Sequence, residues 1–255
     1  MADALLQINN LSKRFGGVIA SDDITLALPA GELHAIIGPN GAGKTTLIGE
    51  LTGEITPDSG EIHFDGRDIT DLPVWRRSAL GLARSFQITS LFPDFTVLDN
   101  VALAVQARSG HSFRFWRDAC VDPELRDPAR AALERVGLAA RADVPVANLS
   151  HGEHRQLEIA MALATQPRLL LLDEPMAGMG PDESARMVRT LRDLKQEFTI
   201  LLVEHDMEAV FALADRITVL VYGRILATGA PAAIRGDEEV RKAYLGAADE
   251  VAHHG

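Results

Sequence analysis

An eight-residue segment, GPNGAGKT at positions 38–45, constrains the fold of this chain more than any other feature. It matches the pattern G-x-x-x-x-G-K-[ST], follows the apolar stretch 33–37 and precedes a predicted helix, which is the context that this pattern requires. Its glycines let successive backbone N–H groups turn inward around phosphate groups, and the helix N-terminus adds a favourable dipole. We therefore predict a nucleoside triphosphate site, in which the Lys44 ammonium reaches the β- and γ-phosphates and the Thr45 hydroxyl is placed for Mg²⁺.

A second apolar stretch ends in two carboxylates. Leucines at 169–172 are followed by Asp173 and Glu174, and open α/β sheets bind their ligands at the C-terminal ends of strands. We predict that Asp173 holds Mg²⁺, usually through water, and that Glu174 lies near the γ-phosphate and accepts a proton from an attacking water. A strand that ends in Asp-Glu is a weak signal alone, because acidic residues often open loops. Together with the segment at 38–45 it becomes a strong one.

The pattern along the chain predicts one helical region between two regions rich in strands. Residues 1–90 indicate short strands separated by turns, with one helix among them near 43–52. Residues 96–166 change to Ala, Leu and Arg at helical spacing, which predicts an inserted helical region. From residue 168 onward strands return, and their continuous apolar character is typical of a parallel sheet covered on both faces. The expected strands are 5–8, 24–28, 33–37, 61–64, 169–172 and 199–203, and a crossover helix is expected at 181–195.

The stretch 110–127 is the least regular part of the helical region, and it contains Phe113, Phe115 and Trp116. A loop that packs these aromatic side chains locally is the expected structure. Docking of a partner on them is the alternative.

Composition and charge exclude several classes of protein. Acidic residues number 36 and Lys plus Arg 25, which gives a net charge of −11 and a pI near 5.2, so the chain lacks the basic character that non-specific nucleic-acid binding needs. The apolar share of 47% and the charged share of 24% fit a globular chain and neither a disordered nor a fibrous one. The single cysteine, Cys120, suits a reducing compartment. The N-terminus lacks a signal-peptide pattern and the apolar runs are strand-sized, so we expect a cytoplasmic protein. Any membrane role must come through a partner.

The segment LSHGE at 149–153 discriminates among nucleotide-binding classes. A phosphate-binding loop alone leaves GTPases, small kinases, helicases and transport ATPases open, and the absence of an Asn-Lys-x-Asp guanine-reading motif counts against a GTPase. The segment lies just before a predicted helix at 156–163. Ser150 and Glu153 also match an S-x-x-E capping box, and capping alone would explain both residues. His151 and His154 have no third ligand candidate near them in sequence, so we predict no metal site there.

Taken together, these residues resemble the ATPases of ATP-binding cassette (ABC) transporters, and the resemblance covers essentially the whole chain. The family's motifs occur in order: an aromatic residue before the first glycine turn (Phe15), the Walker A loop (38–45), the Q-loop glutamine (Gln87), the signature (149–153), Walker B (169–174) and the switch histidine (His205). The resemblance implies an α/β P-loop NTPase fold, with a RecA-like parallel sheet core, an N-terminal antiparallel β-subdomain and an inserted helical subdomain. The chain 1–255 would be a single ABC ATPase domain, with 1–87 and 166–255 as the nucleotide-binding core and β-subdomain and 88–165 as the helical subdomain that carries the signature.

The resemblance also implies residue roles that the sequence alone leaves open. A lone Phe15 is usually a core residue, a lone Gln87 a loop residue and a lone His205 a structural histidine. In this family Phe15 would stack on adenine, Gln87 would contact Mg²⁺ or the water, and His205 would contact the γ-phosphate. Ser150 and the backbone at Gly152 would bind the γ-phosphate held by the opposite subunit. The implied ATP-binding residues are Phe15, Gly38, Pro39, Asn40, Gly41, Ala42, Gly43, Lys44, Thr45, Thr46, Ser150 and Gly152; the implied catalytic residues are Glu174, His205 and Gln87; the implied Mg²⁺ ligands are Thr45, Gln87 and Asp173.

Within the family, the pattern is most similar to the ATPase subunits of branched-chain amino acid importers. The matching segments are ARSFQ at 83–87, Leu91-Phe92, TVLDN at 96–100, EPMAGM at 174–179, VEHDM at 203–207 and Tyr244-Leu245-Gly246. Urea and short-chain amide importers share most of these segments, and the lipopolysaccharide exporter ATPase shares several. One departure is Gly180, which stands at the end of the D-loop where Asp or Asn is common and so removes a side chain expected to touch the partner subunit.

The implied function is ATP hydrolysis, with Mg²⁺, that powers uptake of branched-chain or related amino acids through a membrane permease. The implied partners are the permease subunits, a second ABC ATPase chain in a homo- or heterodimer and, indirectly, a periplasmic solute-binding protein. The ATPase would be a cytoplasmic subunit, peripheral on the inner face of the cell membrane.

Two rival classes remain. A soluble ABC clamp of DNA repair or translation is opposed by the net charge of −11 and by the lack of a second cassette, a coiled coil or a zinc-cysteine set, so no nucleic-acid partner is expected. A regulatory ABC subunit that binds ATP without turnover is opposed by the intact Glu174 and His205.

Overall fold

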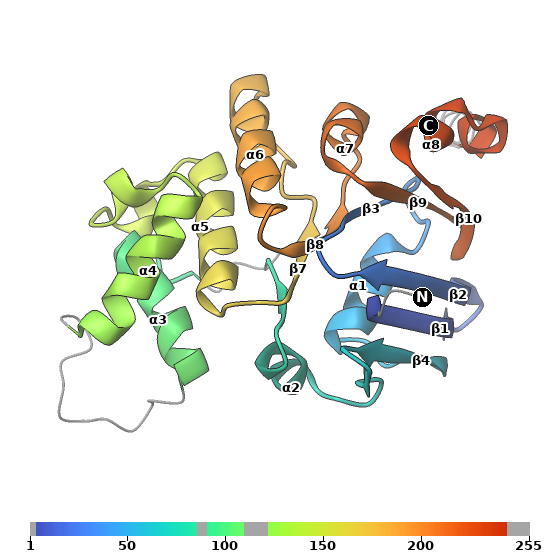
Figure 1. Cartoon of the computed structure of the whole chain (residues 1–255), viewed down its shortest axis with the longest axis horizontal. Helices are drawn as coiled ribbons and strands as arrows, with labels where there is room; N and C mark the ends of the chain where they lie inside the picture. Colours follow the sequence, from blue (N-terminus) through green and yellow to red (C-terminus); the bar gives the residue numbers. More distant parts are fainter. Residues whose placement is uncertain (1–3, 86–90, 110–121, 244–255) are drawn as a thin grey trace.

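The computed structural model describes residues 4–85, 91–109 and 122–243, and within these ranges it contains two sheets with helices around them (Figure 1). The strands of the first sheet are β3 (Leu33–Ile37), β6 (Leu82–Arg84), β7 (Leu169–Asp173), β8 (Thr199–Val203), β9 (Arg216–Val221) and β10 (Arg224–Gly229). Those of the second are β1 (Ala4–Phe15), β2 (Val18–Pro29), β4 (Ser59–Phe64) and β5 (Arg67–Asp68). The first sheet has the order β10-β9-β3-β8-β7-β6, and the second has the order β2-β1-β4-β5.

The six-stranded sheet is the predicted parallel core. Strands β6, β7, β8, β3 and β9, in this order across the sheet, pair in parallel, and β10 pairs with β9 antiparallel. Every residue of β3, β7 and β8 is buried. Ile36 packs into a core shared with α1 (Lys44–Thr52), whereas its neighbours Ala35 and Ile37 pack with α7 (Met207–Leu213) and α8 (Pro231–Gly236). This alternation follows from the two-residue period of a strand and confirms the prediction of a sheet covered on both faces.

The predicted N-terminal antiparallel sheet is also present. Strands β1 and β2 form a hairpin that turns at Gly16-Gly17, and β4 pairs with the other edge of β1, with Ile8 opposite Ile62. The strands are longer than the predicted 5–8 and 24–28. The apolar alternation of β1 fades after Leu11, where its side chains become partly exposed, although backbone pairing continues to the turn.

Among the described residues of the stretch predicted to be a helical insert, there are three α-helices. They are α3 (Val97–Ser109), α4 (Pro123–Arg135) and α5 (His151–Ala164), and they pack together beside the sheet (Figure 1). The predicted crossover helix is α6 (Pro181–Leu194), between β7 and β8. The subdomain limits at 87/88 and 165/166 stay predictions. Within the residues described, none of the helices combines the length and apolar character that a bilayer crossing needs.

The prediction of one helix within residues 1–90 is wrong, because a second one, α2 (Val74–Ala79), follows β5. The side chain of Arg77 accounts for it. This side chain is 1% exposed, and its guanidinium donates hydrogen bonds to the carbonyl oxygens of Glu50, Leu51, Thr70 and Leu72. These contacts hold a helix that is too short to show helical spacing in sequence.

Two helix starts also differ from prediction. Of the irregular stretch 110–127, residues 110–121 lie outside the described residues, but 123–127 form the first turns of α4. Asp122 caps this helix by accepting from the Glu124 N–H at 3.1 Å, and Pro123 occupies a first-turn position. The helix predicted at 156–163 begins earlier, at His151, because its cap is Ser150.

Candidate functional site

The loop 38–43 joins β3 to α1 and folds around the side chain of Lys44. This lysine is the first residue of α1 and is only 8% exposed. Its Nζ donates to the carbonyl oxygens of Gly38 at 2.7 Å and Pro39 at 3.0 Å. Burial lowers the pKa of Lys44, and the negative charges of Glu174 and Asp173 oppose that shift. The ammonium is therefore held against its own loop, near both predicted carboxylates.

Two glycines let the loop pass close to neighbouring backbone. A Cβ on Gly38 would lie 2.1 Å from the carbonyl oxygen of Leu220, and one on Gly43 would lie 2.2 Å from that of Ala20. Gly43 also has a φ of 101°, a conformation that L side chains rarely adopt. As the N-cap of α1, Gly43 leaves the first N–H groups of the helix without a capping side chain. A phosphate group suits such a helix start.

Asp173 ends β7 with its side chain 2% exposed. Arg84 of β6 donates from Nη2 to Asp173 Oδ2 at 3.0 Å and from Nη1 to Glu54 Oε2 at 2.6 Å. Burial raises the pKa of Asp173, whereas the positive charges of Arg84 and Lys44 lower it. Such a partner matters because an unpaired buried charge is costly. Carboxylate and hydroxyl oxygens are the ligands that Mg²⁺ prefers, so Asp173 and the exposed Thr45 fit this cation.

The predicted catalytic pair, Glu174 and His205, follows two neighbouring strands, β7 and β8. Glu174 has a φ of 48°, and its N–H donates to the carbonyl oxygen of Val203 at 2.8 Å, which ties the end of β7 to β8. His205 Nδ1 lies 3.8 Å from Glu174 Oε1, and the His205 side chain is 63% exposed. Because β3 is the other neighbour of β8, the structure brings both side chains to the sheet edge from which the phosphate loop also leaves.

Ser150 caps α5 and forms the predicted capping box. Its Oγ accepts from the Glu153 N–H at 3.2 Å, and Glu153 Oε2 accepts from the Ser150 N–H at 2.8 Å. Ser150 Oγ also lies 3.5 Å from Glu183 Oε1 of α6. A cavity of about 420 Å³ opens here, with Ser150, Gly152 and Glu183 in its lining. No residue of 38–46 lines this cavity.

The other predicted contact residues belong to the β1–β2 turn, to the phosphate loop or to segments outside the described residues. Phe15 stands at the β1–β2 turn with its ring half exposed, 5.5 Å from Lys13 Nζ. Within the loop, Asn40, Gly41 and Thr45 are exposed, Gly38 and Ala42 are buried, and Pro39, Gly43 and Thr46 are half-buried. Gln87 lies outside the described residues, as does the segment 244–246.

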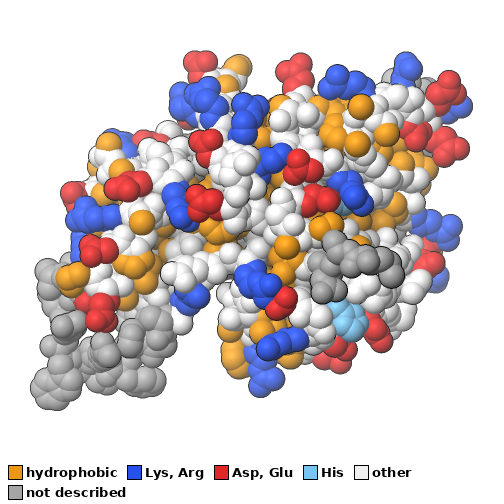
Figure 2. All heavy atoms as spheres, in the orientation of Figure 1, with side chains coloured by type: hydrophobic (Ala, Val, Ile, Leu, Met, Phe, Trp, Pro, Cys, Tyr) orange, Lys and Arg blue, Asp and Glu red, His pale blue; other side chains and the backbone are white. Residues whose placement is uncertain are grey.

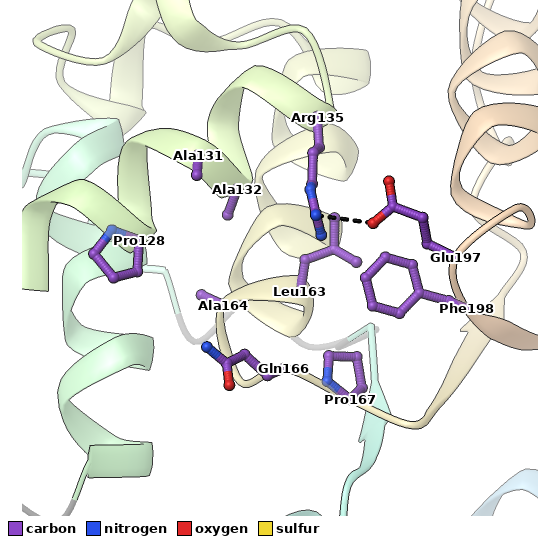
Figure 3. Close-up of a pocket in the computed structure, with 10 residues that line it drawn as sticks. All are labelled: Pro128, Ala131, Ala132, Arg135, Leu163, Ala164, Gln166, Pro167, Glu197 and Phe198. Carbon is purple, nitrogen blue, oxygen red and sulfur yellow. Dashed lines mark ion pairs between the residues drawn. The ribbon is translucent and has the colours of Figure 1, made fainter.

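A second cavity, of about 400 Å³, lies between α4, the end of α5 and the turn before β8 (Figure 3). Arg135 and Glu197 form an ion pair at 2.8 Å in its wall, and the Arg135 guanidinium lies 5.5 Å from the ring centroid of Phe198. The rest of the lining is Pro128, Ala131, Ala132, Leu163, Ala164, Gln166 and Pro167. None of the predicted site residues belongs to it, so this cavity is not the reaction site.

Sequence reasoning missed two charged residues of the site, Arg84 and Glu204. Arg84 pairs with Asp173. Glu204 directly follows β8, is 1% exposed and accepts the N–H of Met176. Both stand at or just after the C-terminal end of a parallel strand, which is the position that pointed to Asp173. The same rule applied to the predicted strand 199–203 finds Glu204. It does not find Arg84, because β6 is not among the predicted strands.

The described residues supply few protein ligands for a cation. Among them, no group of three or more His, Cys, Asp or Glu side chains is arranged to hold a metal ion. A cation at this site would take most of its ligands from phosphate oxygens and water, as Mg²⁺ commonly does.

On the face shown in Figure 2, Lys and Arg side chains are interspersed with Asp and Glu.

Known proteins match this chain along nearly its whole length. The family model described as "ABC transporter" matches residues 21–177, and the one described as "Branched-chain amino acid ATP-binding cassette transporter" matches 224–250. Over 97% of its length, the chain is 39% identical to the full length of the high-affinity branched-chain amino acid transport ATP-binding protein LivG of Escherichia coli K12. It is 37% identical, again over 97% of its length, to the full length of BraF of Pseudomonas aeruginosa.

Solved structures share both the fold and part of the sequence. The ADP conformation of an ATP-binding cassette of an ABC transporter matches with a TM-score of 0.84 and 29% identity, over 96% of this chain and 99% of that one. A dimeric post-hydrolysis cassette bound to ADP and Pi matches with a TM-score of 0.75 and 25% identity, over 89% and 98%. The phosphate loop, the Asp-Glu pair and the histidine at one sheet edge agree with these matches, and the chain belongs to the ABC transporter family of P-loop ATPases.

Proposed function

We propose that this chain hydrolyses ATP to power the uptake of branched-chain or related amino acids through a membrane permease. The observation that carries the proposal is the 39% identity, over 97% of the chain, to a protein named for high-affinity branched-chain amino acid transport. The match at 224–250 to a branched-chain family model supports the same class of solute. The convergence of Glu174, His205 and the phosphate loop at one sheet edge supports hydrolysis.

The described side chains divide the work of hydrolysis. The Lys44 ammonium and the N–H groups of the phosphate loop bind the β- and γ-phosphates, where negative charge is concentrated. Glu174 accepts a proton from the attacking water. His205, whose Nδ1 lies 3.8 Å from Glu174 Oε1, donates a hydrogen bond to the γ-phosphate and stabilises the charge that develops there.

Mg²⁺ and adenine complete the proposed nucleotide site. When bound, Mg²⁺ neutralises charge on the β- and γ-phosphate oxygens. The Thr45 hydroxyl, the Asp173 carboxylate and the Gln87 amide would hold it. Phe15, half exposed at its hairpin turn, stacks on the adenine.

The signature implies a second chain. Ser150 and Gly152 line a cavity that no residue of 38–46 lines. As the family resemblance implies, each chain lends its signature to the nucleotide of a second ABC ATPase, identical or similar. The dimeric relative bound to ADP and Pi supports this arrangement. Such contacts form only in the closed dimer, so ATP binding closes it and hydrolysis reopens it. The pair sits on its permease at the inner face of the cell membrane. A periplasmic binding protein delivers solute to the permease and is therefore only an indirect partner of the ATPases.

Uptake by a strain that lacks this gene tests the solute. Deletion should abolish uptake of radiolabelled leucine, and the wild-type gene, but not Glu174→Gln, should restore it. Urea uptake by the same strains tests the alternative importer class, and the surface lipopolysaccharide tests the exporter. Leucine uptake that survives deletion while one of these is lost would show that the solute assignment is wrong.

Light scattering tests the shared site. The Glu174→Gln chain, alone or mixed with the second ATPase of its transporter, should dimerise with ATP and not without it. Ser150→Arg should abolish permease-coupled hydrolysis, because the larger side chain fills the place of the partner's γ-phosphate. If the Glu174→Gln chain fails to dimerise with ATP both alone and in the mixture, and the Ser150→Arg transporter hydrolyses ATP normally, the chains do not share nucleotide sites.

A further inference from the structure

The carboxylate of Glu204 joins the two loops that carry Glu174 and His205. Glu204 directly follows β8 and is 1% exposed. Its Oε1 accepts the N–H of Met176 at 2.9 Å, and its Oε2 accepts the N–H of His205 at 2.9 Å and that of Asp206 at 3.4 Å. Met176 stands two residues after Glu174, so one buried carboxylate connects the loop after β7 to the loop after β8.

The sheet itself does not need this connection. Strands β7 and β8 already pair along their whole length, from Leu169 opposite Thr199 to Asp173 opposite Val203. The Glu204 hydrogen bonds begin where this pairing ends. A buried carboxylate is costly unless it is well hydrogen-bonded, and here its bonds are used to fix the segments that leave the sheet.

We propose that Glu204 is a positioning residue for hydrolysis, which holds His205 at a fixed distance from Glu174. This inference rests on the roles proposed above for those two residues. His205 Nδ1 lies 3.8 Å from Glu174 Oε1 and 3.7 Å from Glu204 Oε2, so a shift of either loop changes the first distance directly. A misplacement of about 1 Å can lower a rate on the order of 10²-fold.

The bonding pattern requires a carboxylate of this length. Glu204→Gln keeps the shape of the side chain but has one acceptor oxygen, and its NH₂ group would face a backbone N–H. Glu204→Asp keeps both oxygens but is one methylene shorter. It should therefore still reach the N–H groups of His205 and Asp206 in its own loop, and lose that of Met176.

Amide hydrogen exchange in the full-length chain tests the connection without using activity. In Glu204→Gln, the Met176 and His205 amides should exchange about tenfold faster or more, because a charge-assisted hydrogen bond is lost at each. In Glu204→Asp, only the Met176 amide should do so. The matched control is Glu158→Gln, since Glu158 is also buried, at 4% exposed, and pairs with Arg155 on α5. Wild-type exchange at Met176 in both Glu204 variants would overturn the inference.

Kinetics test the consequence for catalysis. Glu204→Gln should lower kcat on the order of 10- to 100-fold, while KM and Kd for ATP stay within about twofold of the wild type. Combined with His205→Ala, it should lower kcat by much less than the product of the two single losses, because most of the effect of Glu204 depends on the position of His205 relative to Glu174. A wild-type kcat in Glu204→Gln, or losses that multiply in the double variant, would contradict a positioning role.

Two further outcomes remain decisive. If Glu204→Gln fails to fold, Glu204→Asp serves for the same comparisons, and a wild-type kcat in that variant would count against the inference. Wild-type turnover in Glu174→Gln or His205→Ala would refute the roles proposed for those residues, and amide exchange would still decide whether Glu204 joins the two loops.

Discussion

The two helix starts that face phosphate in the proposed site, those of α1 and α5, are built in opposite ways. Helix α1 begins after Gly43, which supplies no capping side chain, and its Lys44 turns back onto the loop carbonyls. Helix α5 begins after Ser150, and the capping box with Glu153 closes its first turn. Arg141 Nε forms an ion pair with Glu153 Oε1 at 2.9 Å. Gly43 therefore leaves the start of α1 without a capping side chain, whereas the side chains of Ser150 and Glu153 cap the start of α5.

This difference predicts different roles for the two helix starts: one determines nucleotide affinity, and the other couples hydrolysis to a second chain. An open start lined with N–H groups suits binding of phosphate by a single chain. A capped start is stable with or without nucleotide, and Glu183 Oε1, 3.5 Å from Ser150 Oγ, already places negative charge beside it. We therefore expect α1 to set the nucleotide affinity of a single chain, and α5 to affect hydrolysis only when a second chain is present.

Removal of the proton acceptor, Glu174, should have the largest effect on the rate of hydrolysis and should leave both helix starts unchanged. Glu174→Gln keeps the size of the side chain, so we expect kcat to fall on the order of 10²-fold or more while ATP affinity is retained. Steady-state hydrolysis and equilibrium dialysis measure the two quantities. Glu134→Gln, at an exposed position of α4, is the control. Normal turnover in Glu174→Gln would move the base elsewhere, with His205 as the first candidate.

The next largest effect separates α1 from α5. Lys44→Ala should weaken ATP binding by a single chain about 10- to 100-fold, because the lost ammonium compensates phosphate charge in the ground state as well as in the transition state. Lys195→Ala, which removes a pair with Asp215, should bind ATP normally. Ser150→Ala should also bind normally as a single chain. Equal affinities for Lys44→Ala and Ser150→Ala in equilibrium dialysis would abolish the distinction drawn between the two helix starts.

Removal of the α5 cap should lower stability modestly. Ser150→Ala should reduce the free energy of unfolding by about 1 kcal/mol, because the Glu153 N–H loses its acceptor. Asp122→Ala, which removes the N-cap of α4, should have a similar cost in urea denaturation. Only Ser150→Ala should also lower hydrolysis by the assembled transporter. The same ATPase activity in both variants would reduce Ser150 to a structural cap.

A further prediction concerns the pH dependence of stability at β3, the strand that leads into α1. His34 is fully buried and hydrogen-bonds Glu32 at 2.8 Å and Thr218 at 2.7 Å; burial lowers its pKa below the usual 6.5, and the hydrogen bond to Glu32 opposes this. Just below pH 6.5, His34 is therefore protonated to a greater extent in the unfolded chain than in the folded chain. Stability that is present above this pH is lost as the pH falls toward the folded-state pKa, by at most about 1.4 kcal/mol per pH unit.

Urea denaturation on either side of that pH measures this slope. His34→Gln should flatten it. A slope that His34→Gln leaves unchanged would assign the acid sensitivity to other groups.

Features that depend on neighbouring residues can be predicted from this sequence. The phosphate loop uses eight consecutive residues, and the strand 169–172 delivers Asp173 at its own end. The box between Ser150 and Glu153 spans one helical turn. The structure confirms β3, β7 and this box, because local spacing alone specifies them.

Features that depend on distant segments could not be predicted in the same way. Helix α2 forms because Arg77 binds carbonyl oxygens from α1 and from the loop before α2. The Arg84–Asp173 pair joins β6 to β7, and the Glu204–Met176 hydrogen bond joins the loops after β8 and β7. No spacing in the sequence reveals these partners.

The pairing of β3 has a consequence for the order of events during synthesis. Leu33 pairs with Ile200, and His34 pairs with Arg216, so both neighbours of β3 are translated long after it. Contacts between such distant segments form slowly, and the ribosome adds only about 5–20 residues per second. A nascent chain that has emerged as far as α6 displays its phosphate loop without the sheet that shapes it. Nucleotide can therefore help to fold this protein only after β8 and β9 have emerged.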